Sequence, residues 1–409
     1  MSEVVSIPQL RFPEFRDEWR VDKFVDLCKF QQGVQVDVEL QSTEPKNNFL
    51  RFLRIENYTQ KSNDFRYIPK ELSSNKSITE NEIAIVRYGA TAGYIGRGLK
   101  GVLANNLFKL VLNKDTLDTD YLFHLLRSYK TFCFFQSEMS GGAMPALSFG
   151  IVGALKLPYS SISEQQKIAA FLTAVDTKIE QLSKKKELLG EYKKGLMQKI
   201  FSQAIRFKAD DGSDFPDWED GLLNTLIDNS RKIRYGIVQP GKYDKNGKYL
   251  IRGKDYSNGW EIPSEFFKVS DAIEKKYSKT RVKKGDVIVC IVGSVGNVMV
   301  IPGWLDGANI TQTTARIAPD KNKLNNQYLY FYFQSLVGRN MIHKHTRVGT
   351  RPGLNIEDVE KFSILLPSLL EQAKIANFLS SIDNKIEQVG KQLDESKQFK
   401  KALLQQMFV

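Results

Sequence analysis

Two long stretches of the chain place apolar residues at alternating intervals of three and four. In the first stretch the series is Ile168, Leu172, Val175, Ile179, Leu182, Leu189, Leu196 and Ile200, interrupted by Lys186 and Lys193. In the second it is Ile375, Leu379, Ile382, Ile386, Val389, Leu393, Leu403 and Met407, interrupted by Ser396 and Lys400. A period of 3.5 residues is typical of a coiled-coil seam. The pattern predicts helices over residues 163–201 and 370–408, each about 60 Å long.

The two stretches are copies of each other at a constant offset of 207 residues. From Glu164 the sequence reads EQQKIAAFL, and from Glu371 it reads EQAKIANFL. Repetition at a fixed offset indicates a tandem duplication. One exposed seam of this length would promote aggregation, so we expect the two helices to pack against each other in antiparallel orientation. Two unrelated amphipathic helices, each buried in its own domain, are the alternative.

Shorter patterns repeat between the helices. Residues 83–86 and 286–292 are β-forming runs followed by glycines, residues 108–112 and 313–317 indicate further strands, and residues 120–127 and 326–336 indicate short helices. Each half opens with an aromatic arm, Leu10-Arg11-Phe12 in one and Ile205-Arg206-Phe207 in the other. We therefore expect an α+β fold: two similar α/β domains separated by two long helices packed as an antiparallel coiled coil, with a pseudo-twofold internal repeat.

These repeats predict the following domain boundaries. They are an N-terminal arm (1–19), a first variable domain (20–158), a central helix (159–205), a linker that doubles as the second arm (206–219), a second variable domain (220–367) and a C-terminal helix (368–409).

Composition narrows the class of protein. The 409 residues are 42% hydrophobic, which is enough for two cores of ordinary domain size. Cys28, Cys133 and Cys290 lie too far apart for a disulfide framework or a zinc site, and no stretch approaches 18 apolar residues, so we expect a soluble cytoplasmic protein. The net charge of +12 favours a polyanionic partner.

Outside the shared framework the two halves differ, which indicates the same task performed on different targets. Basic, aromatic and amide residues gather in these variable parts, a mixture that suits DNA because cations neutralise phosphates and Arg, Asn and Gln pair with base edges. The candidate contacts of the first half are Gln35, Arg54, Asn57, Tyr58, Arg87, Tyr88 and Arg97. Those of the second half are Arg234, Tyr235, Gln239, Arg252, Lys254, Ser294, Asn297, Gln312, Arg347 and Arg351.

No pattern indicates a catalytic or metal site. Residues 96–101 match the dinucleotide-binding glycine spacing by letter, but a strand pattern follows them where the fingerprint requires a helix. The histidines are His124, His343 and His345, and the last two lie in a basic stretch with no carboxylate cluster nearby in sequence. We therefore expect neither catalytic residues nor metal ligands in this chain.

One repeated motif resembles a known family. Leu157-Pro158 and Leu366-Pro367 each precede a Glu-Gln-x-Lys-Ile-Ala-x-Phe-Leu-x-x-x-Asp-x-Lys-Ile helix, as in the DNA specificity subunit of type I restriction-modification systems. Weaker marks are Gly236-x-x-Gln239, its looser counterpart Gly33-Val-Gln35, and Gly285-Asp286. The resemblance covers the whole chain and implies two recognition domains, each of which reads one half of a split DNA target.

The resemblance also implies the partners. The chain would bind double-stranded DNA and two methyltransferase subunits that methylate adenine, and through them restriction subunits. It would bind no cofactor itself, because S-adenosylmethionine, ATP and Mg belong to the partner subunits. Two alternatives stay open from the residues alone: a coiled-coil scaffold for other proteins, or a self-contained DNA-modifying enzyme.

Overall fold

The computed structural model describes residues 8–73, 76–139, 145–257, 259–347, 349 and 352–408. Its contacts divide the chain into two compact units. Unit 1 comprises Met1–Ser183 and Lys391–Val409, and unit 2 comprises Lys184–Gly390. Both long helices, α6 (Ile162–Phe201) and α11 (Leu369–Met407), cross this division, so each unit contains one segment of each helix.

Unit 1 contains three sheets, ordered β1-β10, β2-β9-β6-β7 and β4-β3-β8-β5. Neighbouring strands are antiparallel except β3 and β8, which are parallel. The strands are β1 (Arg20–Lys23), β2 (Cys28–Gln32), β3 (Phe49–Leu53), β4 (Arg66–Pro69), β5 (Ser77–Ile78), β6 (Ala84–Val86), β7 (Ile95–Gly96), β8 (Gly101–Leu103), β9 (Leu107–Leu112) and β10 (Lys156–Tyr159).

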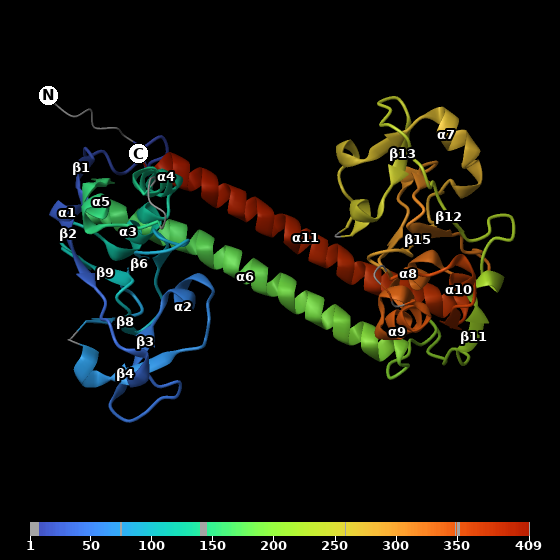
Figure 1. Cartoon of the computed structure of the whole chain (residues 1–409), viewed down its shortest axis with the longest axis horizontal. Coiled ribbons are helices and arrows are strands. Elements are labelled where there is room, and N and C mark those ends of the chain that lie inside the picture. Colours follow the sequence, from blue (N-terminus) through green and yellow to red (C-terminus); the bar gives the residue numbers. More distant parts are fainter. Residues whose placement is uncertain are drawn as a thin grey trace. The chain divides into compact units, whose positions relative to one another are not determined.

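The short helices of unit 1 are α1 (Phe24–Leu27), α2 (Ile55–Thr59), α3 (Thr119–Leu126), α4 (Tyr129–Glu138) and α5 (Phe149–Ala154). Four of them, α1, α3, α4 and α5, gather where α6 begins, whereas α2 lies with β3 and β4 on the other side of the unit (Figure 1). Ile168 and Leu172 of α6 share the main core with Trp19 and Tyr121, and Leu403 of α11 closes it.

Unit 2 repeats this arrangement with its own strands. Its sheets are ordered β11-β19, β12-β18-β15-β16 and β14-β13-β17, and only β13 and β17 pair in parallel. The strands are β11 (Glu219–Leu222), β12 (Arg234–Tyr235), β13 (Lys248–Ile251), β14 (Phe267–Val269), β15 (Val287–Cys290), β16 (Val298–Val300), β17 (Asn309–Ile310), β18 (Thr314–Ile317) and β19 (Ser363–Leu366). The helices are α7 (Asp271–Lys276), α8 (Asn326–Gln334), α9 (Leu336–His345) and α10 (Ile356–Glu360).

The predicted long helices and central strands are confirmed. Each long helix begins one residue before its predicted start, and the strands expected at residues 83–86 and 286–292 are β6 and β15. Residues 101–103 form strand β8, as expected for a glycine-rich turn that is not a dinucleotide site. The helix expected over residues 326–336 was wrong in extent, because α8 ends at Gln334 and α9 follows after Ser335.

The glutamate that opens each long helix holds the preceding aromatic arm. Glu164 is fully buried and accepts two hydrogen bonds from the Arg11 guanidinium, at 2.7 and 2.8 Å, and one from the Trp19 indole at 3.3 Å. In unit 2, Glu371 is also fully buried. It accepts two bonds from Arg206 at 3.3 and 2.9 Å and one from the Trp218 indole at 3.0 Å. The repeated Glu is therefore a structural anchor for the arm.

The glutamine that follows satisfies backbone groups inside each unit. The buried Gln165 amide donates to the carbonyls of Thr116 and Ser160 at 2.9 and 2.8 Å, and its oxygen accepts the Asp118 N–H at 2.9 Å. Gln372 repeats the three bonds with Lys323, Pro367 and Asn325. Because buried backbone groups need partners, this glutamine connects the turn before the long helix to the start of α3 or α8.

Two of the lysines that interrupt the apolar seam are paired with aspartates. In unit 1, Lys400 of α11 lies 2.5 Å from an Asp176 carboxylate oxygen of α6. In unit 2, Lys193 of α6 lies 2.6 Å from Asp383 of α11. Both pairs follow the 207-residue offset, so the repeat places the same ion pair in each unit with the roles of the two helices exchanged.

Two glycines occupy positions where a side chain has no room. A Cβ at Gly33 would lie 2.2 Å from the Ala104 carbonyl oxygen, and a Cβ at Gly236 would lie 1.8 Å from that of Ile310. The residue after each glycine forms a parallel bridge, Val34 with Ala104 in unit 1. The glycine therefore allows the segment after it to lie directly against a neighbouring strand end.

Candidate nucleic-acid interface

A glycine-rich hairpin follows the central strand in each unit and packs on a helix. In unit 1, residues 89–93 follow β6, and Gly93 lies beside Phe135 of α4. In unit 2, residues 293–297 follow β15, and Gly296 lies beside Ile342 of α9. Gly89, Gly93, Gly293 and Gly296 all have a φ between 86° and 91°. The left-handed backbone that these turns require explains the glycines.

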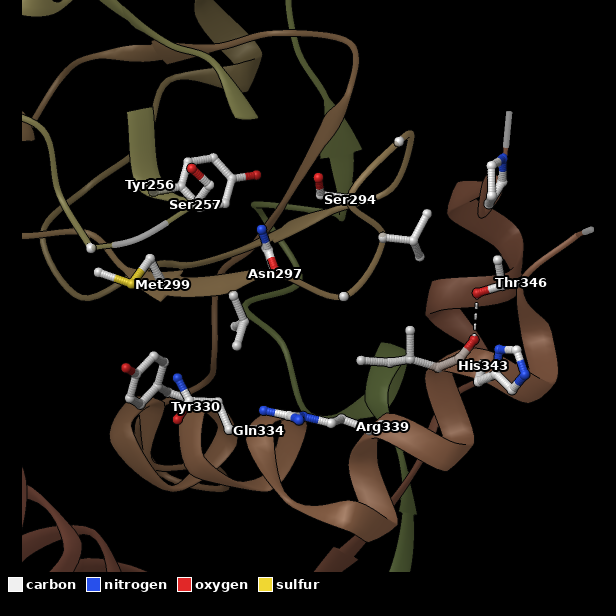
Figure 2. A pocket seen from close by; sticks show the side chains of 17 residues that line it. Tyr256, Ser257, Ser294, Asn297, Met299, Tyr330, Gln334, Arg339, His343 and Thr346 are labelled. Carbon is white, nitrogen blue, oxygen red and sulfur yellow. Dashed lines mark hydrogen bonds between the residues drawn. The ribbon is translucent and has the colours of Figure 1, made fainter. Parts of the chain in front are cut away.

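In unit 2 the hairpin and the helices α8 and α9 enclose a groove of about 850 Å³, which we call the hairpin groove (Figure 2). Ser294 and Asn297 come from the hairpin, whereas Gln334 and Arg339 come from the helices. Figure 2 shows the two pairs on opposite walls. The predicted contacts Ser294 and Asn297 thus lie across the groove from Gln334 and Arg339, which the sequence analysis did not identify.

The break between α8 and α9 shapes the wall of the groove that the two helices form. Ser335 ends α8 with its N–H bonded to the Phe331 and Tyr332 carbonyls, and its hydroxyl accepts the Gly338 N–H at 3.1 Å as the N-cap of α9. Ser–backbone capping of this kind starts a new helix. Arg339 follows in the first turns of α9 and is exposed.

Side chains in the hairpin groove are free to bind a ligand. Among the described residues, the Asn297 amide and the Arg339 guanidinium have no hydrogen-bond or ion-pair partner. The Gln334 amide contacts the Tyr330 hydroxyl, and burial raises the pKa of Tyr330, so this hydroxyl is neutral at physiological pH. The groove therefore offers amide, hydroxyl and cationic groups, and no carboxylate is among the described residues that line it.

A second hollow of unit 2, of about 400 Å³, contains two more of the predicted contacts. Tyr235 of β12 and Gln312 line it together with Asn355 and Glu357. Tyr235 is 48% exposed, and Gln312 is also exposed. An amide and an aromatic ring are brought together here, as the prediction for a base-contacting surface requires.

The other predicted contacts of unit 2 differ in whether their side chains are exposed or already bound to other residues of the unit. Arg234, Gln239 and Lys254 are exposed. The Arg252 guanidinium is held by the fully buried Asp255, at 3.1 and 2.9 Å, and by the Glu265 carbonyl at 3.0 Å. Arg347 is exposed and lies 3.9 Å from Asp358. Arg351 lies outside the described residues.

In unit 1, three of the predicted DNA contacts lie in the turn after β3, where their side chains interact with nearby residues of the same unit. The Arg54 side chain lies 2.8 Å from Glu56 and 3.3 Å from Asp64. Asn57 is 4% exposed, and its amide oxygen accepts the Arg54 N–H at 2.8 Å. Tyr58 is 5% exposed. In this structure Asn57 and Tyr58 do not present their side chains to a ligand, because both are used to close the turn and the core beneath it.

The remaining predicted contacts of unit 1 lie at or near its surface. Gln35 is exposed and accepts a hydrogen bond from Asn105 at 3.1 Å. The Arg87 guanidinium stacks over the rings of Tyr88 and Phe149, at 4.9 and 4.7 Å, and Tyr88 is 38% exposed. Arg97 pairs with Asp120, and its guanidinium lies 4.1 Å from the centre of the Phe123 ring.

The repeat could have identified residues that composition did not. Asn105 precedes β9 as Gln312 precedes β18, because Val34 and Ile237 form equivalent bridges to Ala104 and Thr311. Ser335 lies 207 residues after Ser128, which caps α4 in unit 1 by accepting the Thr131 N–H. Aligning these two serines would have revealed the helix break and, with it, Gln334 and Arg339.

The described residues contain no group of three or more His, Cys, Asp or Glu residues arranged to hold a metal ion. His124 is 1% exposed, and burial lowers its pKa to about 4, so it is neutral. Burial raises the pKa of the Cys28 and Cys290 thiols, which disfavours the reactive thiolate. No helix among the described residues is long and apolar enough to cross a membrane.

Comparisons with known proteins agree with this arrangement. Residues 16–190 and 227–396 match the family described as Type I restriction modification DNA specificity domain. The Type I restriction enzyme MjaVIII specificity subunit of Methanocaldococcus jannaschii is 28% identical, over 97% of this chain and 92% of that protein. The Type I restriction enzyme EcoBI specificity subunit of Escherichia coli is 24% identical, over 72% of this chain and 65% of that protein.

A solved structure shares the fold. The type I restriction-modification S subunit from M. genitalium matches with a TM-score of 0.63 and 16% identity, over 99% of each chain. The family match covers most of the chain and occurs twice, once for each copy of the repeat. The chain therefore belongs to the type I restriction-modification DNA specificity family.

Proposed function

We propose that this chain is a non-catalytic specificity subunit that recognises a split DNA sequence, with one half-site read by each unit. One observation carries the proposal: the two units repeat the same sheets, hairpin and capped helices, while the side chains on their surfaces differ. The net charge of +12 and the amide and cationic groups of the hairpin groove support DNA as the ligand. Two half-sites add their discrimination, so two small units together can achieve genome-level specificity.

The two long helices, in this proposal, form an antiparallel pair that sets the spacing between the half-sites. Two ion pairs support the orientation. Asp176 near the start of α6 pairs with Lys400 near the end of α11, and Asp383 near the start of α11 pairs with Lys193 near the end of α6. Their pseudo-twofold arrangement would offer two equivalent docking sites, one for each of two methyltransferase subunits.

Chemistry would then reside in the partner subunits, and the complex would act in the cytoplasm. Adenine methylation with S-adenosylmethionine belongs to the docked methyltransferase subunits, and ATP- and Mg-dependent restriction belongs to subunits recruited through them. A scaffold that binds other proteins, or a self-contained modifying enzyme, would need a different set of exposed groups. A solved structure from work on complex assembly of the type I R-M system shares this fold (TM-score 0.55, 19% identity), which supports such partners.

The test combines the purified chain with separately purified methyltransferase subunits. With S-adenosylmethionine and genomic DNA, we expect adenine methylation at a two-part motif only when both components are present. Methylation by the chain alone would identify it as an enzyme in its own right. If the chain binds duplex DNA without a steep loss of affinity between low and physiological salt, or does not bind it, a scaffold role replaces DNA recognition.

A further inference from the structure

The hairpin groove of unit 2 has a counterpart in unit 1 in which the same positions carry different side chains. The Val86 N–H bonds to the Tyr94 carbonyl in unit 1, as the Cys290 N–H bonds to the Asn297 carbonyl in unit 2. Tyr94 therefore occupies the place of Asn297. The 207-residue offset matches Gln334 with Arg127 and Arg339 with Phe132.

The exchanged side chains differ sharply in chemistry. Asn297, Gln334 and Arg339 are two amides and a cation, whereas Tyr94 and Phe132 are aromatic residues that are 41% and 56% exposed. Packing does not demand these differences, because in both units the positions lie outside the main hydrophobic cores. Positions that vary on a constant backbone are where a recognition domain can change its target.

The backbone around Asn297 is fixed while its side chain stays free. The Asn297 carbonyl accepts the Cys290 N–H at 2.7 Å, and the Asn297 N–H donates to the Ser294 carbonyl at 3.3 Å. Figure 2 shows its amide between the hairpin and the helices. Because the backbone is already fixed, binding has to order only the Asn297 side chain and not the loop, which lowers the entropic cost.

Gln334 is oriented by its neighbour. Its amide contacts the Tyr330 hydroxyl one turn earlier on α8, which leaves one amide N–H and the carbonyl oxygen available. A carbonyl acceptor beside an N–H donor matches the N6 amine and N7 of adenine in the major groove. Arg339 lies on the same wall, and among the described residues no carboxylate neutralises it.

We infer that the hairpin groove determines the specificity of unit 2, with Asn297 and Gln334 reading adenine edges and Arg339 binding an adjoining phosphate. This inference rests on the proposed function and assigns it to particular side chains. It follows that removing an amide relaxes one base position, whereas removing the arginine weakens binding to every sequence alike. The second half-site depends on unit 1 and is unaffected.

The experiment maps methylated adenines by sequencing in cells that lack other adenine methylation and that express the chain with its methyltransferase subunits. Asn297→Ala and Gln334→Met should each make one base position of a single half-site degenerate, with about a 5- to 150-fold loss of discrimination. Arg339→Met should keep the motif, lower its occupancy, and reduce the slope of log affinity against log salt by about 1. Tyr94→Asn should alter the other half-site alone.

Matched controls use exposed residues of unit 2 outside the groove. Asn246→Ala and Lys321→Met should leave motif and occupancy unchanged. If Asn297→Ala disturbs the hairpin, Gln334→Met still tests the inference, because Gln334 lies on helix α8 and not in the hairpin. Wild-type motifs at wild-type occupancy for both Gln334→Met and a folded Asn297→Ala overturn the inference. A wild-type complex that yields no two-part motif instead refutes the proposed function, and this inference with it.

Discussion

Replacing Glu164 by Gln should destabilise unit 1 by about 3 kcal/mol. The Glu164 carboxylate is fully buried and receives two bonds from Arg11, whose side chain is only 13% exposed. Removing one partner of a buried ion pair costs about 3–5 kcal/mol, because the other charge stays buried without compensation. Arg11 retains some contact with solvent, which argues for the lower end of this range. Glutamine keeps the shape of the side chain, so the loss reports the charge.

Urea unfolding followed by circular dichroism measures the change, and hydrogen exchange over residues 8–19 reports release of the arm. Glu14→Gln is the matched control. Glu14 lies in the same arm and pairs with Lys167 of the same helix, but both side chains are nearly half exposed. An exposed pair of this kind contributes at most about 1 kcal/mol.

A double variant separates the charge from the packing. Arg11→Met combined with Glu164→Leu replaces the buried pair by apolar groups and should recover most of the stability lost in Glu164→Gln. Glu371→Gln in unit 2 should cost less than Glu164→Gln, because its partner Arg206 is 25% exposed. If Glu164→Gln unfolds at the same urea concentration as Glu14→Gln, the buried glutamate is not what holds the arm.

Three further predictions concern other parts of the chain. Arg252→Ala should destabilise unit 2 by about 1–3 kcal/mol, because it removes hydrogen-bond donors from the buried Asp255 carboxylate. Lys254 is exposed, so Lys254→Ala should alter DNA affinity alone. Equal melting temperatures for the two variants would contradict this prediction. The pKa of His124 is lowered from 6.5 to about 4, so the folded protein binds fewer protons than the unfolded chain and the free energy of unfolding falls as pH drops through this range. His124→Phe, which copies Phe331 of unit 2, should flatten that pH dependence in urea titrations between pH 4 and 7. Inserting one heptad near Leu182 should lengthen the spacer of the methylated motif by up to about three base pairs without changing either half-site, and an unchanged spacer would exclude the long helices as its determinant.

The repeat made the long helices and the framework strands predictable. Periodicity gave α6 and α11 to within one residue, because a 40-residue seam contains many independent signals. The arms were recognised as copies, but their purpose was not. Only the structure shows that Arg11 and Trp19 meet at Glu164, since contacts across 145 or more residues leave no periodic trace.

The candidate site was harder to predict because composition does not give side-chain direction. Arg54, Asn57 and Tyr58 follow β3 in a turn where Asn57 caps its own backbone, so residues chosen for their base-pairing chemistry serve the turn. Gln334 escaped notice because residues 326–336 read as one continuous helix, and Arg339 because it lay beyond the predicted end of that helix. The serine that breaks it, Ser335, is a weak signal alone and a strong one once it is paired with Ser128.

The close approach at Gly33 and Gly236 sets a limit on how such a protein can diverge. The atoms that exclude a side chain there belong to the backbone of Ala104 and Ile310, so no substitution elsewhere can make room. Surface residues of the two units are free to drift apart until neither resembles the other, yet each lineage must retain this glycine. Descendants that recognise unrelated DNA would therefore remain identifiable by the few positions at which evolution has no alternative residue.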